Sequence, residues 1–464
     1  MPFEWDSVVV GGGMSGLGAG IRLALAGQKV LLLEKHHALG GLNGYYFKGG
    51  FRYDVGLHAL TNFVPKRAAQ KPLTKLCRQL RLSYESLNLQ PQGVSCIRFP
   101  EKKLEFNNDF EYFETQVVEN FPLEKDRFKR LVAELGTEDV LSLENQPFVS
   151  ARQRLETYLS DRQLIEMLLL PLLYYGSPTS HDIDWRQFVI LFEALYREGF
   201  ARPMGGVRTM IHQLRRQYQR YGGTLKVRCG VKALRVKDRR VSEIILETGE
   251  TVRAKRVLSS VGLAETYALQ IPSTGIVFPR LPLTFLETIT VLQGRPETHR
   301  WPYTIVFYSH RERVRYDLAE TLVDLDSGVI CLPENYRQTE YGSTTTLRTT
   351  HLSNFRNWEK LSSEAYRHSK NECRLASRRN ALQVLGSTDS LEILAEDMFT
   401  PLTLQRYTGH FHGGVYGYPE KARDGRTNLE NLFVCGTDQG FLGIVGALLS
   451  GVSIANRYFL SSDV

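Results

Sequence analysis

The chain has 464 residues, of which 42% are hydrophobic and 23% are charged, and its formal net charge is +8 at pH 7. This composition is typical of globular proteins and excludes disordered and fibrous classes, while the length predicts more than one structural unit. The charge is modest for this size and no basic helix carries interleaved aromatic residues, so nucleic acid is not an expected partner.

Six cysteines lie far apart, with neither CxxC nor metal-ligand spacing. This favours reduced thiols in a cytosol over a disulfide framework. The first strand is predicted from about Ser7 and leads straight into a glycine-rich turn, which leaves no room for a cleavable signal sequence. No uninterrupted apolar stretch reaches the ~18 residues of a spanning helix, so we expect a cytoplasmic protein that does not cross a membrane.

A strand, a glycine-rich turn and a helix are predicted at the start of the chain. Gly11, Gly13 and Gly16 form a GxGxxG turn between an apolar strand and a helical pattern, and a second buried strand ends in Glu34. In such a βαβ unit the glycines let the backbone approach a pyrophosphate at the helix N-terminus. The acidic residue accepts hydrogen bonds from the ribose hydroxyls. The sequence therefore predicts a dinucleotide site.

Two later segments favour FAD over NAD. The pair Gly40 and Gly41 lies just beyond Glu34, and Gly436-Thr-Asp438 precedes a second glycine-rich helix start. Both fit a second contact with a long cofactor, in which Asp438 binds ribityl or pyrophosphate-side hydroxyls and the helix amides face negative charge or a flavin carbonyl. A packing helix capped by Asp438 is the alternative, but it leaves the glycines unexplained. We predict one FAD, held without a covalent bond.

The pattern between these ends predicts two units. Residues 63–202 are expected to form a largely helical insertion, and 273–399 combine a strand at 283–292 with a helix at 362–385. We predict an α/β fold with a Rossmann-like FAD-binding domain of the glutathione-reductase type and an inserted α+β domain that binds substrate and faces the membrane. The FAD-binding domain takes residues 1–62, 203–272 and 400–464, and the substrate-binding domain takes 63–202 and 273–399.

Four blocks of sequence carry a resemblance to a known family. They are residues 8–41, Gly50-Phe-Arg-Tyr-Asp-Val-Gly-Leu-His58, Pro203-Met-Gly-Gly-Val207 with Val231 beyond, and residues 407–451. In these blocks the chain resembles the phytoene desaturase, carotenoid isomerase and retinol saturase family of amine-oxidase-like FAD enzymes. Residues 54–58 and 437–447 look closer to the isomerase and saturase branch. Gly40-Gly-Leu-Asn43 departs from the wider amine-oxidase pattern, which has an Arg after the glycine pair.

The resemblance implies which residues hold the cofactor. It places the backbone of Val231 against the adenine, and Gly56, Leu57 and His58 near the flavin. Together with the motif residues, the predicted cofactor-binding set is Gly11, Gly13, Met14, Ser15, Gly16, Glu34, Lys35, Gly40, Gly41, Leu42, Gly56, Leu57, His58, Val231, Gly436, Asp438, Gly443, Ile444 and Val445.

Few catalytic side chains are needed where a flavin carries the hydride. His58 is a candidate for proton transfer or substrate orientation, and Tyr416 for a contact with flavin or substrate, with simple packing as the alternative for both. The pairs His36-His37 and His410 with His412 lack carboxylate or cysteine companions, so no metal is predicted. Cys435 is expected to be a buried strand residue and not a covalent flavin link.

The resemblance implies an FAD-dependent oxidoreductase that desaturates, saturates or isomerises double bonds of a polyisoprenoid or carotenoid-like lipid. We expect the insertion to line an apolar tunnel, with a quinone or another electron acceptor or donor as redox partner. An apolar patch at residues 188–200, with basic clusters at 215–220 and 235–240, predicts a peripheral contact with an anionic inner membrane face. Solvated basic faces are the alternative for these clusters.

Two other functions stay open at this point. One is a flavin oxidase of a small amine, which the missing Arg after Gly41 disfavours. The other is a non-catalytic lipid-binding escort protein of the same fold, and the intact Glu34 and Asp438 argue against it because they indicate retained FAD.

Overall fold

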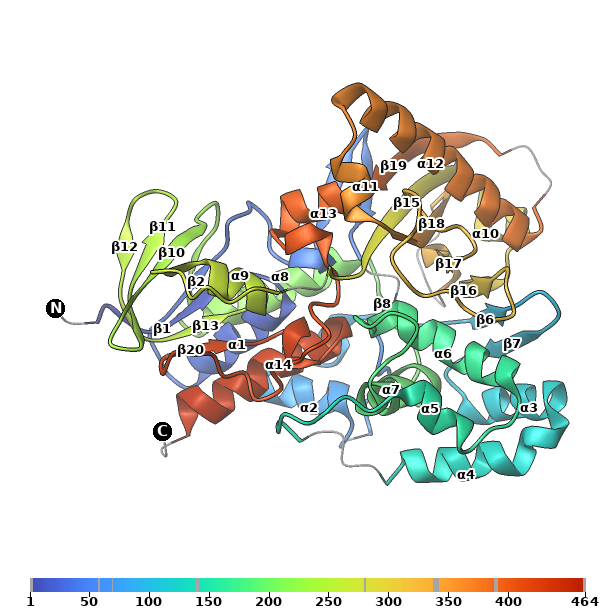
Figure 1. The fold of residues 1–464 in the computed structure, drawn as a ribbon, viewed down its shortest axis with the longest axis horizontal. Helices are drawn as coiled ribbons and strands as arrows, with labels where there is room; N and C mark the ends of the chain where they lie inside the picture. Colours follow the sequence, from blue (N-terminus) through green and yellow to red (C-terminus); the bar gives the residue numbers. More distant parts are fainter. Residues whose placement is uncertain are drawn as a thin grey trace.

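Three stretches that lie far apart in sequence form one parallel sheet. The computed structural model describes residues 3–56, 59–68, 70–137, 142–278, 281–336, 342–387 and 391–461. The sheet has the order β20-β13-β1-β2-β9, and all neighbouring strands are parallel (Figure 1). Its strands are β1 (Trp5–Val10), β2 (Val30–Leu33), β9 (Thr224–Lys226), β13 (Ala254–Ser259) and β20 (Leu432–Val434).

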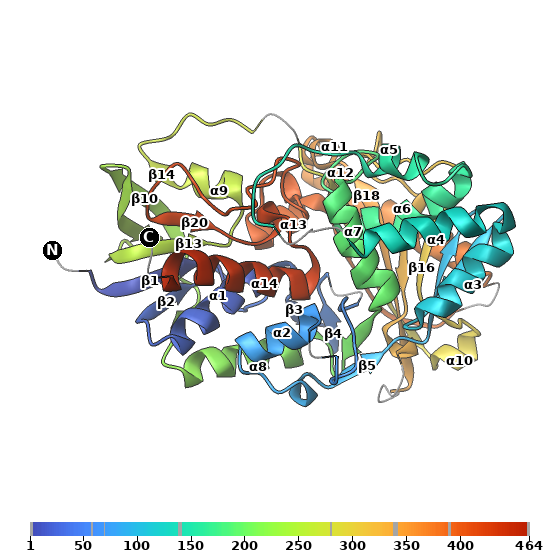
Figure 2. The ribbon, with the colours of Figure 1, turned by 90° about the horizontal axis from the view of Figure 1, so that it is seen from below.

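Helices cover one face of this sheet and a smaller sheet covers the other. The helices that pack apolar side chains on it are α1 (Met14–Leu25), α2 (Pro72–Gln79), α8 (Val207–Arg220) and α14 (Gly443–Ala455) (Figure 2). The opposite face carries β10 (Val231–Lys237), β11 (Arg240–Leu246), β12 (Thr251–Val252) and β14 (Gln270–Ile271). A Cβ on Gly451 would overlap the backbone oxygen of Ser15, so glycine permits the close crossing of α14 over α1.

One helical stretch in the described residues is long and apolar enough to cross a membrane. It runs from Gly443 to Leu460, through α14 and a π-helical turn, and 56% of it is buried inside the structure. The sequence analysis missed it because Asn456 and Arg457 interrupt the apolar run. Its apolar residues belong to the same core as α1, so in this structure it packs as a core helix.

A seven-stranded sheet forms the second unit, in the order β19-β15-β18-β17-β16-β6-β7. Its strands are β6 (Val94–Arg98), β7 (Lys103–Phe106), β15 (Thr284–Gln293), β16 (Tyr303–Ser309), β17 (Ser327–Cys331), β18 (Thr344–Ser353) and β19 (Ile393–Phe399). α12 (Ser363–Leu385) covers one face. The other face carries α3 (Phe110–Asn120), α4 (Lys125–Leu135), α5 (Ala151–Glu156), α6 (Arg162–Gly176) and α7 (Trp185–Phe192), as Figure 1 shows.

One prediction for residues 63–202 is wrong. The apolar patch expected at 188–200 is absent from the surface, since Phe188, Phe192 and Phe200 are all 0% exposed and pack in the core beneath the sheet. The segment is largely helical and also supplies β6 and β7, whose runs are too short to be assigned from periodicity; β6 pairs with the distant β16, and β7 pairs with β6.

The remaining named strands and α-helices are short. They are β3 (Tyr45–Lys48), β4 (Phe51–Asp54), β5 (Leu89–Pro91), β8 (Ala201–Pro203), α9 (Leu263–Ala268), α10 (Pro296–His299), α11 (Phe355–Glu359) and α13 (Pro401–Thr408). Asp54 at the end of the β3–β4 hairpin forms a buried ion pair with Arg202 of β8, 2.6 Å between Nη2 and Oδ2. The same oxygen accepts the amide of Val207 at the start of α8. The second and third resemblance blocks therefore meet in space.

His351 gives the second unit a defined pH dependence. Its ring is fully buried between β18 and α12, with Nδ1 3.2 Å from the carbonyl oxygen of Ser327 and Nε2 3.0 Å from Oγ of Ser377. Burial lowers the pKa of His351 from 6.5 to about 4, and the Ser327 carbonyl opposes this only in part. The unfolded chain therefore binds more protons between these values, and stability is lost as pH falls from about 7 to 4.

We expect His351→Gln to remove much of this slope, up to roughly 3 kcal/mol over the window. Urea unfolding at pH 7 and pH 4.5 measures it, with the exposed His368 on α12 replaced by glutamine as the matched control. An equal pH slope in the His351 variant and the wild type would contradict the assignment.

Candidate functional site

The turns that follow four parallel strands meet at the carboxyl edge of the first sheet. Gly40 donates its amide to the oxygen of Gly12 at 2.9 Å, so the second glycine pair lies against the first glycine-rich turn. A Cβ on Gly16 would overlap the backbone oxygen of Gly11, which shows how closely α1 approaches β1. Such an edge is where open α/β sheets bind dinucleotides.

The N-terminus of α1 has the properties of a pyrophosphate site. Its N-cap is Gly13, no side chain caps it, and no acidic residue lies in its first turn. A Cβ built on Gly13 meets no atom within 4 Å, so the space in front of the helix is open. Backbone N–H groups and the helix dipole favour an anion there. Met14 and Ser15 supply first-turn amides while their side chains are buried.

Glu34 closes the same site from the end of β2. Its Oε2 accepts the amide of Gly12 at 2.7 Å and its Oε1 accepts the amide of His36 at 2.7 Å. The carboxylate is held rigidly, and each oxygen keeps a lone pair for a ribose hydroxyl. The carbonyl of Glu34 accepts the amide of Cys229 at 2.9 Å, which places Val231, the first residue of β10, nearby. These contacts support the predicted adenosine pocket.

The C-terminal motif lies on the other side of α1. Gly436 has a φ of 105°, and its amide donates to Oγ of Ser450 at 2.6 Å. Asp438 is buried and accepts two backbone amides, from Tyr418 at 2.9 Å on Oδ1 and from Leu263 at 2.6 Å on Oδ2. Asp438 therefore clamps three segments together at the sheet edge, and binding of a ribityl hydroxyl by its remaining lone pairs stays a prediction.

Several other predicted residues lie around this edge. Gly56 has a φ of 65° and a Cβ there would overlap the oxygen of Leu42, so the hairpin end and the second glycine turn touch. Gly443 starts α14 close to Thr61. Lys35 extends to the loop at Gly409. The side chains of Ile444 and Val445 are buried in α14, so only their backbone amides are left to serve the predicted site, while Leu57 and His58 lie outside the described residues.

The hydroxyl of Tyr416 already has a partner. It donates to the carbonyl oxygen of Tyr174 in α6, and its ring lies 5.6 Å from that of Phe285 in an edge-on contact. Tyr416 thus ties the loop beside the C-terminal motif to the second unit. Its predicted catalytic role remains a prediction, and this contact supports the packing alternative.

Lys421 is a candidate that the sequence analysis did not find. Its Nζ donates to the carbonyl oxygen of Tyr416 at 2.6 Å, and its side chain packs beside Gly440 in the C-terminal motif. Burial lowers the pKa of Lys421 to about 8, although the carboxylate of Asp438 opposes that shift. No sequence motif marks it, because only the fold of residues 413–440 buries this amine.

Cys435, the residue after β20, has the properties of an unreactive buried thiol. It is 3% exposed, and burial raises its pKa to about 12. Thiolate chemistry, including attack on a flavin, is disfavoured for such a group. Within the described ranges no three His, Cys, Asp or Glu side chains are grouped so as to hold a metal ion.

A cleft of about 830 Å³ opens beside Glu34 and Gly41. Its walls are the β3–β4 hairpin, β19, α12 and α13, and they include Leu39, Tyr45, Tyr46, Phe47, Val55, Tyr366, Met398, Phe399, Leu402 and Tyr407. None of its lining residues comes from 63–202; the hairpin and α13 line this cleft, and a tunnel lined by the insertion stays a prediction. The lining also includes the charged residues Lys48, Lys370, Asp397 and Arg406, so the cleft is mainly aromatic and apolar with a charged part, and it adjoins the dinucleotide site.

Comparison with known proteins agrees with this geometry. A family model described as flavin containing amine oxidoreductase matches residues 14–457. The chain is 23% identical to prolycopene isomerase 1 from an Oncidium hybrid cultivar, over 98% of this chain and 84% of that protein. It is 24% identical to all-trans-retinol 13,14-reductase from Danio rerio, over 98% of this chain and 87% of that protein.

Solved structures confirm the expected fold class. An oxidoreductase from Methanosarcina mazei superposes with a TM-score of 0.66 at 16% identity, over 97% of this chain and 100% of that one. At this identity the likeness concerns the fold alone, and it covers both units of the present structure.

Proposed function

Because the chain belongs to the flavin containing amine oxidoreductases and is an FAD-dependent oxidoreductase, we propose that its substrate is a polyene isoprenoid of the carotenoid or retinoid class. The observation that carries this proposal is the match over 98% of the chain to both a prolycopene isomerase and a retinol reductase. The reaction introduces a carbon–carbon double bond, reduces one or isomerises one.

The cofactor site described above fits this role. The α1 N-terminus would hold the pyrophosphate, Glu34 the ribose, and the start of α14 with Asp438 the far end. The bound flavin supplies hydride transfer to or from carbon. The protein's own residues then bind the polyene, orient it and exclude water. Lys421, a half-buried amine beside the C-terminal motif, is the group that we propose holds a proton there.

The aromatic cleft supports an apolar substrate. It joins the dinucleotide edge at Gly41 and reaches the surface at Phe47 and Tyr407, which are 63% and 53% exposed. Aromatic walls and a polar dinucleotide end are typical of sites for long apolar ligands. We therefore propose that the polyene enters between the hairpin and α13.

The proposal includes two partners. In a desaturase, a quinone or a similar electron acceptor would reoxidise the reduced cofactor. In a saturase, an electron donor would reduce the oxidised cofactor. We also propose that the protein is cytoplasmic and works peripherally on the inner membrane face, where such lipids reside. The buried patch at 188–200 no longer supports that location, but the exposed Phe47 at the cleft mouth does.

Anaerobic spectroscopy of the FAD-loaded protein tests the proposal. Detergent-solubilised carotene or retinol is added to the oxidised and, separately, the reduced enzyme, while the flavin bands and the polyene isomers are followed. We expect one of three results: bleaching for a desaturase, reoxidation for a saturase, or isomerisation without net flavin change. A polyene unchanged under both conditions, with bleaching by a small amine, would overturn the proposal; no reaction with either would indicate an escort protein.

A further inference from the structure

The cleft beside the β3–β4 hairpin contains one hydrogen-bonded group of polar side chains. Asp397 of β19 accepts the hydroxyl of Tyr46 on Oδ2 and the ammonium of Lys48 on Oδ1, each at 2.8 Å. All three residues line the cleft, and we call them the Tyr46–Asp397–Lys48 group. The side chain of Lys48 is 59% exposed and that of Asp397 is 12% exposed, so the group lies near the mouth. In a mainly apolar site, a few converging polar groups fix the orientation of the ligand.

The aromatic packing around Tyr46 makes this group rigid. The Tyr46 ring is stacked on that of Tyr53, with 5.0 Å between the ring centroids, and meets the Phe399 ring edge-on at 5.5 Å. Both neighbouring residues are buried. Burial raises the pKa of Tyr46 above its usual value of 10, so the phenol stays neutral and donates to Asp397. A ligand would therefore meet a preformed polar group, which lowers the cost of binding.

The group retains hydrogen-bonding capacity for a ligand. Burial opposes ionisation of Asp397, but hydrogen bonds from Lys48 and Tyr46 outweigh it and hold the pKa of Asp397 below its usual value of 3.8. A carboxylate has about four acceptor sites, and Tyr46, Lys48 and the amide of Met398 use them only in part. The ammonium of Lys48 likewise has N–H donors left after its bond to Asp397. An acceptor and a donor side by side match a hydroxyl, which donates and accepts.

The charges in the cleft disfavour a charged end group on the ligand. Lys370 of α12 and Arg406 of α13 line the same cleft, and their positive charges would repel an ammonium group. The carboxylate of Asp397 would repel a carboxylate that approached its free acceptor site. A neutral hydroxyl meets neither repulsion.

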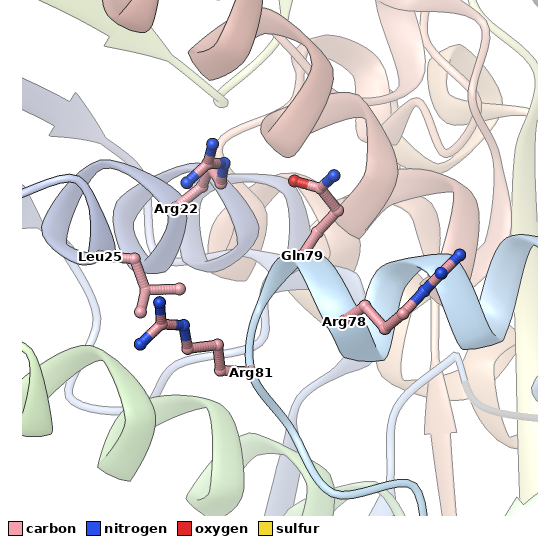
Figure 3. A pocket seen from close by; sticks show the side chains of 5 residues that line it. All are labelled: Arg22, Leu25, Arg78, Gln79 and Arg81. Atoms are coloured by element: carbon pink, nitrogen blue, oxygen red, sulfur yellow. The ribbon is translucent and has the colours of Figure 1, made fainter.

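A second pocket, on the helical layer of the first unit, does not have converging polar groups. Its volume is about 410 Å³, and its lining residues are Arg22, Leu25, Arg78, Gln79 and Arg81. Figure 3 shows that the guanidinium of Arg78 is directed away from those of Arg22 and Arg81, so these charges do not meet around one ligand. Hydrogen bonds hold the members of the Tyr46–Asp397–Lys48 group together, and the cleft is therefore the better candidate for polar recognition.

We propose that the Tyr46–Asp397–Lys48 group binds a hydroxyl at one end of the polyene, so that the protein selects polyene alcohols over polyene hydrocarbons. This inference rests on the proposed function and deepens it by naming the end group of the substrate. Asp397 accepts the hydroxyl, an N–H of Lys48 donates to it, and the chain extends along the aromatic walls toward Gly41. A site that binds a hydroxyl rejects the analogue without one, because its own polar groups are then left unpaired.

Binding of three retinoids to the FAD-loaded protein tests this inference. The probes are retinol, retinoic acid and deoxyretinol, in which a methyl group replaces the hydroxymethyl end. Each probe is titrated in the dark without oxygen and followed by quenching of protein fluorescence. The variants are Tyr46→Phe and Asp397→Asn, and retained flavin absorbance shows that each is folded. Tyr112→Phe is the matched control, because the Tyr112 hydroxyl also donates to a carboxylate, that of Glu105 at 2.7 Å, and Tyr112 does not line the cleft.

We expect the wild type and the Tyr112 control to bind retinol at least about tenfold more tightly than deoxyretinol, which is the scale of one hydrogen bond to a charged group. In the Tyr46 and Asp397 variants, the affinity for retinol should fall toward that for deoxyretinol. The affinity for deoxyretinol should stay the same, because the apolar walls are intact. Damage to the fold would instead weaken the binding of both.

Three results would overturn this inference and leave the proposed function in place. They are equal binding of retinol and deoxyretinol by the wild type, tighter binding of retinoic acid than of retinol, and an equal loss of affinity for retinol and deoxyretinol in the variants. Failure of all three retinoids to bind the wild type would overturn the proposed function as well, because the cleft would then not be a polyene site.

Discussion

Glu34→Gln is expected to weaken FAD binding by about a hundredfold while leaving the protein folded. The carboxylate accepts the amides of Gly12 and His36 at 2.7 Å each, and its remaining lone pairs face the predicted ribose. In the variant, the glutamine side chain has one accepting oxygen and one NH₂ group in place of two accepting oxygens. The NH₂ group would face a backbone N–H donor, and one hydrogen bond to the ribose would be lost. Each charge-assisted bond contributes about 1.5–3 kcal/mol, which makes two orders of magnitude the expected scale.

Titration of the apoprotein with FAD, followed by flavin fluorescence, measures this loss. Glu250→Gln is the control, because Glu250 is an exposed carboxylate that pairs with Lys226 at 2.8 Å and lies away from the glycine-rich turn. Unchanged FAD affinity in the Glu34 variant would show that the ribose is bound elsewhere and would remove the main support for the adenosine pocket.

Substitutions of two glycines in the same turn should affect different properties. Gly13→Ala should weaken FAD binding, and Gly16→Ala should destabilise the fold. Gly13→Ala places a methyl group where no protein atom lies within 4 Å, and the φ of Gly13, −70°, suits alanine. We therefore expect the apoprotein to stay as stable as the wild type, with FAD affinity lowered by at least about tenfold because the methyl group occupies the pyrophosphate's space.

Gly16→Ala should instead damage the fold. Its methyl group would overlap the backbone oxygen of Gly11 and crowd Oγ of Ser260, and backbone cannot move aside as a side chain can. Overpacking of this kind costs about 1–3 kcal/mol or more. Urea unfolding of both apoproteins, with FAD titration of the Gly13 variant, separates the effects. A Gly13 variant with normal FAD affinity would contradict the pyrophosphate assignment.

The sequence was sufficient for the parts of the site that depend on local geometry. A GxGxxG turn needs only neighbouring residues to adopt its shape, so Gly11, Gly13 and Gly16 could be assigned without knowing the fold. Glu34 follows from the same unit, since the end of the second strand always lies beside that turn. The C-terminal glycine motif was predicted from neighbouring residues in the same way. The parallel sheet brings the N-terminal and the C-terminal glycine motifs to the same edge.

Tertiary structure decided the features that depend on burial and on distant pairing. The apolar run at 188–200 has the composition of either a surface patch or a core, and only packing beneath the seven-stranded sheet places it inside. The strands β6 and β7 are too short for their period to show; β6 is defined by pairing with β16, which lies far away in the sequence, and β7 by pairing with β6. The half-buried amine of Lys421 and the cleft beside the β3–β4 hairpin likewise arise from segments that meet only in the folded chain.

Charge illustrates the same division. Two basic clusters can be identified from the sequence, and an acidic ribose ligand can be predicted from it for the cofactor site. The sequence could not determine which arginines have carboxylate partners, because ion pairs such as Arg240 with Glu430 join residues that are close only after folding. Local motifs depend on the backbone geometry of neighbouring residues, so they can be recognised in the sequence. Burial, cavities and the neutralisation of charges depend on contacts between distant residues, so they follow only from the folded structure.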